Sequence, residues 1–91
     1  MILNFACADT EKLFNGQKPS RKFVIPSRLH QKTIEALQAV HAATTLQDFW
    51  LLPSLKLKRV VGSKIKYEVR INNEYRIYFK WTDQGAEKVE A

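Results

Sequence analysis

The feature that most constrains the fold is a pair of alternating segments near the end of the chain. Over residues 67–71 apolar side chains alternate with charged ones, and the alternation resumes over residues 75–81. A period of two residues is typical of a β-strand with one buried face and one exposed face. The two segments therefore predict adjacent antiparallel strands, with an apolar face toward a core and a polar face toward solvent.

The loop between these segments predicts how the strands pair. A two-residue loop mixes apolar and polar side chains on each face. A three-residue loop, Asn72-Asn73-Glu74, keeps each face uniform because Ile71 then lies opposite Tyr75. Asparagine tolerates the left-handed backbone that such a loop needs. In this register two like-charged pairs lie side by side on the polar face, Arg70 with Arg76 and Lys66 with Lys80.

The sequence before these strands predicts helices. Ser27–Ala43 carries apolar residues at spacings of three and four, which is typical of an amphipathic helix. Asp9 or Thr10 is predicted to cap a shorter helix that ends at Asn15-Gly16. Met1–Phe5 alternates weakly and predicts a short first strand.

Three further elements complete the predicted order. Thr45 is predicted to cap a short turn through Asp48, Leu55–Lys58 alternates like a strand, and Ala86–Ala91 follows a turn and begins another strand. This order predicts an α+β domain, with an N-terminal short strand and two helices packed on an antiparallel β-sheet meander. At 91 residues we expect one domain, 1–91.

The charge of the chain indicates an anionic partner. Lys and Arg number 15 against 9 Asp and Glu, a formal net charge of +6. Nucleic acid, the ribosome, an acidic protein and a membrane surface all fit this charge. A single cysteine, Cys7, forms no internal disulfide, which favours a reducing, cytoplasmic location. No apolar run approaches the roughly 20 residues that span a bilayer, so we expect no membrane partner.

The facing arginines are the strongest candidates for a functional site. Like charges in direct cross-strand pairs are mildly destabilising, whereas two guanidinium groups offer planar forks of donors that match phosphate oxygens. Arg70 and Arg76 are therefore predicted to clamp a phosphate. The alternative is that they are solvated and splayed apart, or paired with Glu68 and Glu74. Residues predicted to assist on the same surface are Lys58, Lys64, Tyr78 and Lys80.

Other residue types give weaker signals. His30 and His41 lie on one predicted helix, about 16 Å apart at 1.5 Å per residue, which excludes a shared metal ion. We interpret both as surface or boundary residues, and Cys7 as an inert thiol because no basic neighbour lowers its pKa. No phosphate loop, metal-ligand cluster or catalytic triad is recognisable, so we expect no cofactor and no metal.

Three stretches resemble a known family: FACADTEKLFNG at residues 5–16, HAATTLQDF at residues 41–49 and, most specifically, YEVRINNEYRIYFKWTDQGAEKVE at residues 67–90. Together they are similar to HigB-type toxins of the RelE/ParE superfamily, also called plasmid maintenance system killer proteins. The resemblance extends over nearly the whole chain. It implies a fold similar to that of small ribonucleases.

The resemblance also implies an activity and partners. Such toxins are ribosome-dependent mRNA endoribonucleases, and a cognate antitoxin, usually a helix-turn-helix DNA-binding protein, holds them inactive. Arg70 and Arg76 match the two sheet arginines of the family that contact the scissile phosphate. The chain would then inhibit translation and growth, with the ribosome and mRNA as further partners.

The sequence departs from the family pattern at several positions. Val61 stands where the family has a lysine, and Lys66 where it has a glycine. The chain given ends at Ala91, before the terminal Asp-Tyr-His motif of the family. These departures leave an alternative, a catalytically disarmed toxin that acts only as a module binding the antitoxin, ribosome or RNA. Gyrase-poisoning members of the superfamily give a third interpretation, against which the two sheet arginines argue.

Overall fold

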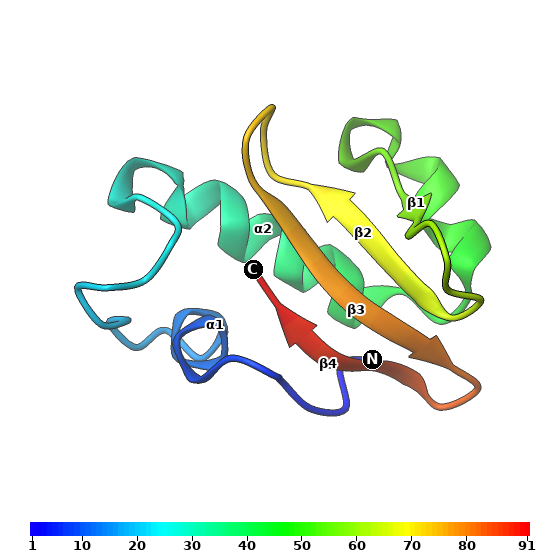
Figure 1. Cartoon of the computed structure of the whole chain (residues 1–91), viewed down its shortest axis with the longest axis horizontal. Coiled ribbons are helices and arrows are strands. Elements are labelled where there is room, and N and C mark those ends of the chain that lie inside the picture. Colours follow the sequence, from blue (N-terminus) through cyan, green and yellow to red (C-terminus); the bar gives the residue numbers. More distant parts are fainter.

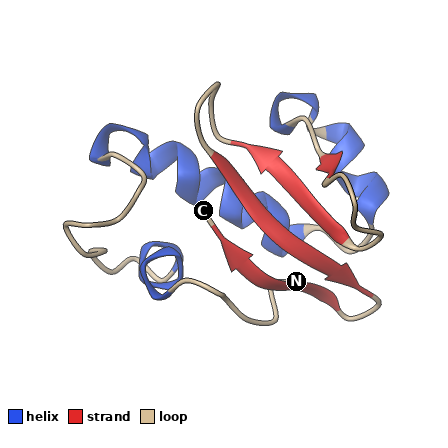
Figure 2. Ribbon diagram, viewed as in Figure 1, coloured by secondary structure: helices blue, strands red, loops and turns tan.

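A computed structural model describes the whole chain, residues 1–91, as a four-stranded sheet with helices against one face (Figure 1, Figure 2). The strands follow in the order β1-β2-β3-β4 and all neighbours are antiparallel, so the predicted α+β meander is confirmed. The helices are α1 (Ala8–Phe14) and α2 (His30–Ala42), with 3-10 turns η1 (Ser27–Leu29), η2 (Leu46–Leu51) and η3 (Pro53–Leu55). The strands are β1 (Lys58–Arg59), β2 (Lys66–Arg70), β3 (Arg76–Thr82) and β4 (Gly85–Glu90).

The central strands β2 and β3 pair in the predicted register. The carbonyl of Tyr75 accepts a hydrogen bond from the Ile71 N–H at 3.0 Å, which closes the loop between the strands. Inside the loop the Asn72 side-chain oxygen accepts from the N–H groups of Glu74 and Tyr75, both at 2.9 Å. This asparagine replaces backbone partners that the loop itself lacks. The predicted polar-face pairs are both present, Arg70 with Arg76 and Lys66 with Lys80.

Helix α2 lies behind the sheet and supplies one side of the core (Figure 1). The predicted stripe is buried along its length: Leu29, Thr33, Ala36, Leu37, Val40 and Ala43. The first turn, predicted as α-helix, is the tighter η1, and Thr33 completes the junction by donating its hydroxyl hydrogen to the Leu29 carbonyl at 2.8 Å. This hydrogen bond offsets the free-energy cost of burying the Thr33 hydroxyl in the core.

The start of α1 differs from its prediction. The helix begins at Ala8, and neither Asp9 nor Thr10 caps it with a side chain. The Asp9 carboxylate instead accepts hydrogen bonds from the backbone N–H and hydroxyl of Ser20, both at 2.9 Å. The fully buried Thr10 hydroxyl accepts from the Ala91 N–H at 3.1 Å. Long-range partners therefore occupy both side chains, which sequence-local reasoning assigned to the cap.

Residues 45–59 confirm one prediction and contradict another. The Asp48 carboxylate accepts from the N–H groups of Thr44 at 2.8 Å and Thr45 at 3.1 Å, which fixes the predicted turn at the start of η2. The predicted strand Leu55–Lys58 is wrong, because strand β1 holds only two residues, Lys58–Arg59. Pro53 begins the turn η3, and Lys56 is left-handed with φ 47°. Neither conformation continues a strand.

The N-terminal residues lie extended beside β4, at one edge of the sheet (Figure 1). The predicted strand Met1–Phe5 is present as two isolated parallel bridges, Ile2 with Ala86 and Phe5 with Val89. Gly85, with φ 141°, permits this approach, because a Cβ at that position would lie 2.2 Å from the Met1 carbonyl oxygen. Any other residue there would displace the N-terminal segment.

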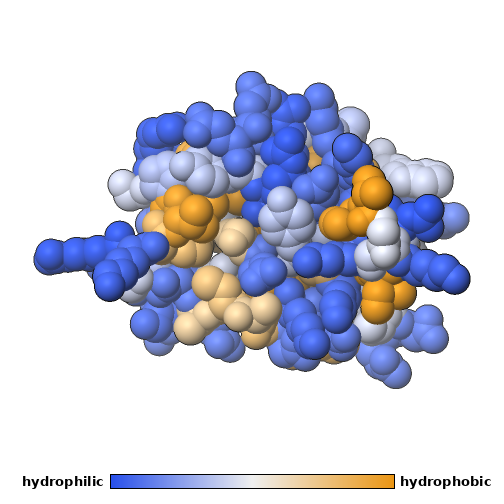
Figure 3. Space-filling view, in the orientation of Figure 1, coloured by the Kyte–Doolittle hydropathy of each residue, from blue (hydrophilic) through white to orange (hydrophobic).

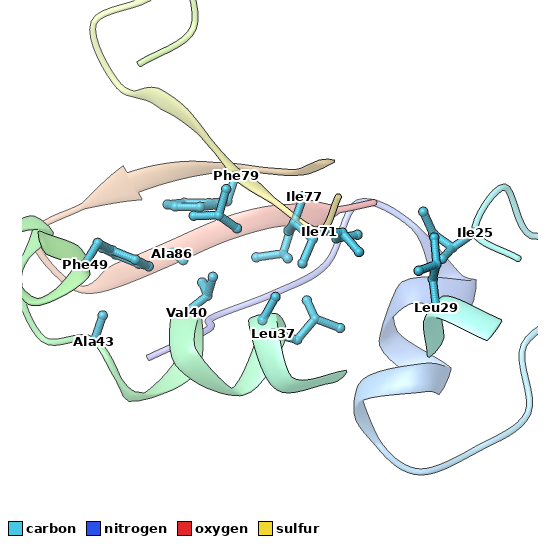
Figure 4. Packing of buried hydrophobic residues seen from close by; sticks show 13 residues of the cluster. Ile25, Leu29, Leu37, Val40, Ala43, Phe49, Ile71, Ile77, Phe79 and Ala86 are labelled. Carbon is cyan, nitrogen blue, oxygen red and sulfur yellow. The ribbon is translucent and has the colours of Figure 1, made fainter. Parts of the chain in front are cut away.

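The core is one cluster of thirteen buried apolar residues between α2, η2 and the apolar face of the sheet (Figure 4). Phe49, from η2, stacks on Phe79 of β3 with ring centroids 5.8 Å apart, and Trp81 closes the group edge-on at 5.9 Å from Phe49. Aromatic rings at this separation add specific attraction to the burial of their surface. No helix of the structure has the length and apolar character needed to cross a membrane.

Candidate functional site

The polar face of β2 and β3 carries the predicted site residues on the side of the sheet away from α2. Figure 3 shows this side as largely hydrophilic, with hydrophobic areas only in isolated spots. Arg70 and Arg76 are cross-strand partners at the end of β2 that leads into the loop 71–75, and Tyr78 lies two positions further along β3. The alternation of the strands places these side chains on one face because successive residues point to opposite sides.

Three carboxylates interrupt the positive charge of this face. Glu68 is opposite Tyr78 on one side and Lys58 on the other, Glu87 is opposite Lys80, and Glu90 is opposite Tyr78. Each of these glutamates is half-buried. The polar face is therefore a mixed surface, in which three glutamates lie beside the like-charged pairs Arg70–Arg76 and Lys66–Lys80.

Arg76 is held in place by its neighbours. Its Nε lies 3.6 Å from a Glu68 carboxylate oxygen, and its Nη1 donates to the Asn72 carbonyl at 2.9 Å. Of the alternatives weighed from the sequence, an Arg76–Glu68 pair is therefore present, with the Arg76 side chain 34% exposed. A guanidinium fixed by a carboxylate and a loop carbonyl keeps its remaining N–H donors in a defined direction. Arg76 is thus orientated before any ligand binds.

Arg76 borders a shallow groove of about 250 Å³ at the edge of the sheet. The groove is also lined by Glu74 and Tyr75 at the end of the loop, by Tyr78, by Ala91 and by the segment Val24–Ile25. Two side chains from the polar face, Arg76 and Tyr78, thus meet a segment that lies about 50 residues earlier in the chain. A phenol and a guanidinium at one groove are suited to stacking on a base and to binding a phosphate.

Arg70 has a different environment from its cross-strand partner. It makes no ion pair in the structure. It lines a second groove, of about 240 Å³, with Lys32, Glu35 and Ala36 of α2 and Leu52 and Leu55 of the η2–η3 region. The two arginines are neighbours in the register yet border different grooves. A phosphate clamp formed by both remains a prediction.

The four assisting residues are only partly brought together. Tyr78 lies under the Lys66 ammonium, with 5.6 Å from Nζ to the ring centroid, in a cation–π contact. Lys80 is opposite Lys66 and Glu87 on the same face. Lys58 and Lys64 are both exposed, and Lys64 lies in the loop before β2, at the opposite end of that strand from Arg70. The structure therefore groups Tyr78 and Lys80 with Lys66 and leaves Lys64 apart.

Both histidines have structural contacts at the surface, as expected for boundary residues. His30 is half-buried, with its Nε2 2.9 Å from the Ile25 carbonyl oxygen. The exposed His41 accepts a hydrogen bond at Nδ1 from the Ile2 N–H at 3.1 Å. These contacts tie α2 to the segments before it, and neither histidine lines the groove of Arg76 or that of Arg70.

Two aspartates outside the sheet have shifted pKa values. The pKa of Asp9 is lowered because the Ser20 N–H, and then the Ser20 hydroxyl, donate to its carboxylate. The pKa of Asp48 is lowered chiefly by the Thr44 N–H and hydroxyl, with a smaller contribution from Thr45. Hydrogen bonds to the charged form favour that form. Both carboxylates fix backbone turns, and neither belongs to the two arginine grooves.

Comparison with known proteins shows the family to which the chain belongs. The family model described as RelE-like toxin of type II toxin-antitoxin system HigB matches residues 3–90. The curated protein Toxin HigB-1 of Vibrio cholerae serotype O1 is 27% identical over 84 residues, covering 91% of this chain and 86% of that protein. The family match spans all the strands and helices described above. The chain therefore belongs to the HigB-like family of RelE-like toxins, the toxin component of type II toxin–antitoxin systems, and its partner is an antitoxin.

Proposed function

We propose that this toxin is a ribosome-dependent mRNA endoribonuclease that inhibits translation and growth in the cytoplasm. The observation that carries the proposal is Arg76, which Glu68 and the Asn72 carbonyl orientate at a groove shared with Tyr78. Arg70 is directly across the strands and is free of ion pairs. The family resemblance of these two arginines supports the same assignment.

The proposed reaction is attack of a ribose 2′-oxygen on the adjacent phosphorus. The new bond joins the 2′-oxygen to phosphorus, the bond from phosphorus to the 5′-oxygen breaks, and the 2′-hydroxyl proton leaves while the 5′-oxygen gains one. Negative charge grows on the non-bridging oxygens as the reaction proceeds. Guanidinium donors aimed at those oxygens stabilise the charge without reorganising. Arg76 has this role in the proposal, with Arg70 as its partner.

The remaining candidate residues, on the polar face and in the loop before β2, are proposed to act in binding. Tyr78 is proposed to stack on a base beside the scissile phosphate, since its ring lies at the groove and against the Lys66 ammonium. Lys58, Lys64 and Lys80 are proposed to contact neighbouring phosphates. The ribosome would present the mRNA as an ordered single strand, which lets a small protein cut messages with little sequence reading of its own. The antitoxin is proposed to be a helix-turn-helix protein.

A second candidate function is a module that binds the antitoxin, ribosome or RNA without cleaving. The Arg76–Glu68 ion pair favours it, because a guanidinium already engaged by a carboxylate has fewer donors for a phosphate. The two candidates differ in a single product, a new 5′ end inside a translated message.

The test is to map 5′ ends on a reporter mRNA in a translating extract. Addition of the wild-type protein is expected to give ends inside the message that require ribosomes. Arg76→Ala is expected to lower their yield by about 100-fold or more, the size of effect seen when one transition-state donor is removed. Arg59→Ala, an exposed arginine on β1 outside both grooves, is the matched control and is expected to cut normally.

Each outcome decides between the candidates. Ends that persist with Arg76→Ala at the wild-type level would remove Arg76 from the chemistry. An absence of new ends with the wild-type protein, together with retained ribosome binding, would establish the binding module. Circular dichroism and thermal melting of both variants distinguish loss of chemistry from loss of fold.

A further inference from the structure

A stretch of positive charge without acidic residues lies outside the sheet. Residues 17–32, here called the basic segment, hold five basic side chains and no aspartate or glutamate: Lys18, Arg21, Lys22, Arg28 and Lys32. All five are exposed, and none takes part in the one ion pair of the structure. Side chains that repel one another and have no acidic partner point to a ligand that carries repeated negative charge.

The backbone of the basic segment is held in place. Ser20 donates its N–H and its hydroxyl hydrogen to the Asp9 carboxylate, each at 2.9 Å. Its hydroxyl oxygen accepts from the Lys22 N–H at 3.3 Å, and its carbonyl accepts from the Phe23 N–H at 3.1 Å. These bonds tie the turn between Lys18 and Lys22 to α1. The basic side chains therefore project from a fixed backbone, which lowers the entropy cost of binding.

The basic segment borders a hollow of about 350 Å³ that shares one lining residue with the groove of Arg76. Lys18 and Arg21 line this hollow together with Phe23 and His30, whose ring centroids are 5.8 Å apart. Ile25 lines both this hollow and the Arg76 groove. The volume lies in the lower part of the range of ligand pockets, about 300–1,000 Å³.

The basic segment also reaches the second arginine. Lys32, on the first turns of α2, lines the groove of Arg70. One stretch of chain therefore touches both arginine grooves, through Ile25 at one and Lys32 at the other.

We infer that the basic segment is a docking surface for the phosphate backbone of RNA, with Lys18, Arg21 and Lys22 as its main contacts. The inference rests on the proposed RNA-directed function. It adds a surface that contributes to RNA affinity, beside the Arg76 groove where cleavage is proposed to occur. Basic side chains beside aromatic rings are typical of binding single strands without sequence preference. The contacts release counterions, so binding through them depends steeply on salt.

The test measures binding of a fluorescein-labelled 2′-O-methyl oligouridylate of twelve nucleotides, which cannot be cleaved through its 2′-oxygen. The variant is Lys18→Gln/Arg21→Gln/Lys22→Gln. The control is Lys56→Gln/Arg59→Gln/Lys88→Gln, which removes the same residue types and the same charge from exposed positions outside the basic segment. The dissociation constant of each protein is measured from low to moderate salt.

Loss of three phosphate contacts is expected to flatten the slope of log affinity against log salt by about 2, at about 0.7 for each contact to a single strand. Affinity at low salt is expected to fall by at least about tenfold for the variant, while the control changes by less than about threefold. Equal changes in the two proteins would show an effect of net charge alone and would overturn the inference.

Two other results would also overturn it. One is a wild-type protein that does not bind the oligonucleotide at low salt. The other is a variant that binds it normally but no longer binds the antitoxin, which would show that the basic segment serves an acidic protein. If the wild-type protein cuts no mRNA but the two variants still differ in salt slope, the RNA surface stands and only the proposed cleavage fails. Thermal melting of both variants confirms that they are folded.

Discussion

The polar face of the sheet and the basic segment each carry five Lys and Arg residues, but only the polar face also carries acidic residues. On the polar face, three glutamates, Glu68, Glu87 and Glu90, lie among five basic residues: Lys58, Lys66, Arg70, Arg76 and Lys80. Residues 17–32 hold five Lys and Arg with no acidic residue among them. On the sheet, Glu68 fixes the direction of the Arg76 guanidinium through an ion pair. In the basic segment no side chain makes an ion pair, so all five positive charges are available to a ligand. Orientation suits chemistry, and uncompensated charge suits affinity.

The largest effect that tests this difference is expected from removing Arg70, the sheet arginine that makes no ion pair. Arg70→Ala is expected to lower cleavage by about 100-fold if both arginines stabilise the same transition state. The fold should be nearly unaffected, with a change of less than about 0.5 kcal/mol, because Arg70 makes no ion pair. Arg59→Ala is again the control. Cleavage near the wild-type level would show that Arg76 acts alone and that Arg70 belongs to the separate groove of α2 and η3.

A smaller effect is expected from the carboxylate that orientates Arg76. Glu68→Gln is expected to raise RNA affinity a few-fold and to steepen the salt dependence, because a negative charge 3.6 Å from Arg76 is lost. Cleavage should fall at the same time, since the guanidinium is held less firmly. Glu11→Gln, an exposed glutamate of α1 that makes no ion pair and lies outside both arginine grooves, is the matched control. A rise in both RNA affinity and cleavage would mean that Glu68 competes with RNA phosphate for Arg76 and does not orientate it for the reaction.

The smallest effect is expected in the pH dependence of stability, and it probes the basic segment. Hydrogen bonds from Ser20 lower the pKa of Asp9, so the charged carboxylate stabilises the fold. This contribution is complete above the ordinary aspartate pKa of about 3.9 and is lost as the pH falls through the lower pKa of the folded state. Asp48 behaves in the same way.

Asp9→Asn is therefore expected to lower the melting temperature near neutral pH and to flatten its fall between about pH 5 and pH 3. The control is Asp83→Asn, on the exposed turn before β4. A melting curve with unchanged pH dependence would show that the Asp9–Ser20 bonds contribute little to the fold.

Sequence patterns predicted the parts of the fold that depend on near neighbours. The two-residue period and the three-residue loop Asn72-Asn73-Glu74 fixed the register, and with it the pairs Arg70–Arg76 and Lys66–Lys80. The stripe of α2 and the Thr45–Asp48 turn were predicted for the same reason, since their signals lie within one or two turns of chain. Local geometry limits these elements to few alternatives.

Other expectations failed where a distant contact competed with a local one. Asp9 and Thr10 are good caps by residue type, but Ser20 and Ala91 engage their side chains instead. Leu55–Lys58 alternates like a strand, yet Pro53 and the left-handed Lys56 bend the chain into η3. An alternating pattern shows which side chains are apolar, but it does not predict the backbone angles that the neighbouring turns impose.

The sequence by itself determined the α+β order, the register of the central strands and the family of the protein. These follow from periodicity, from the length of one loop and from motifs that are contiguous in the chain. The tertiary structure alone decided that Arg76 is held by Glu68 and Asn72, that Arg70 borders another groove, and that the basic segment reaches both. Side-chain direction and the meeting of distant segments depend on how α2 packs on the sheet, and no local pattern encodes that packing.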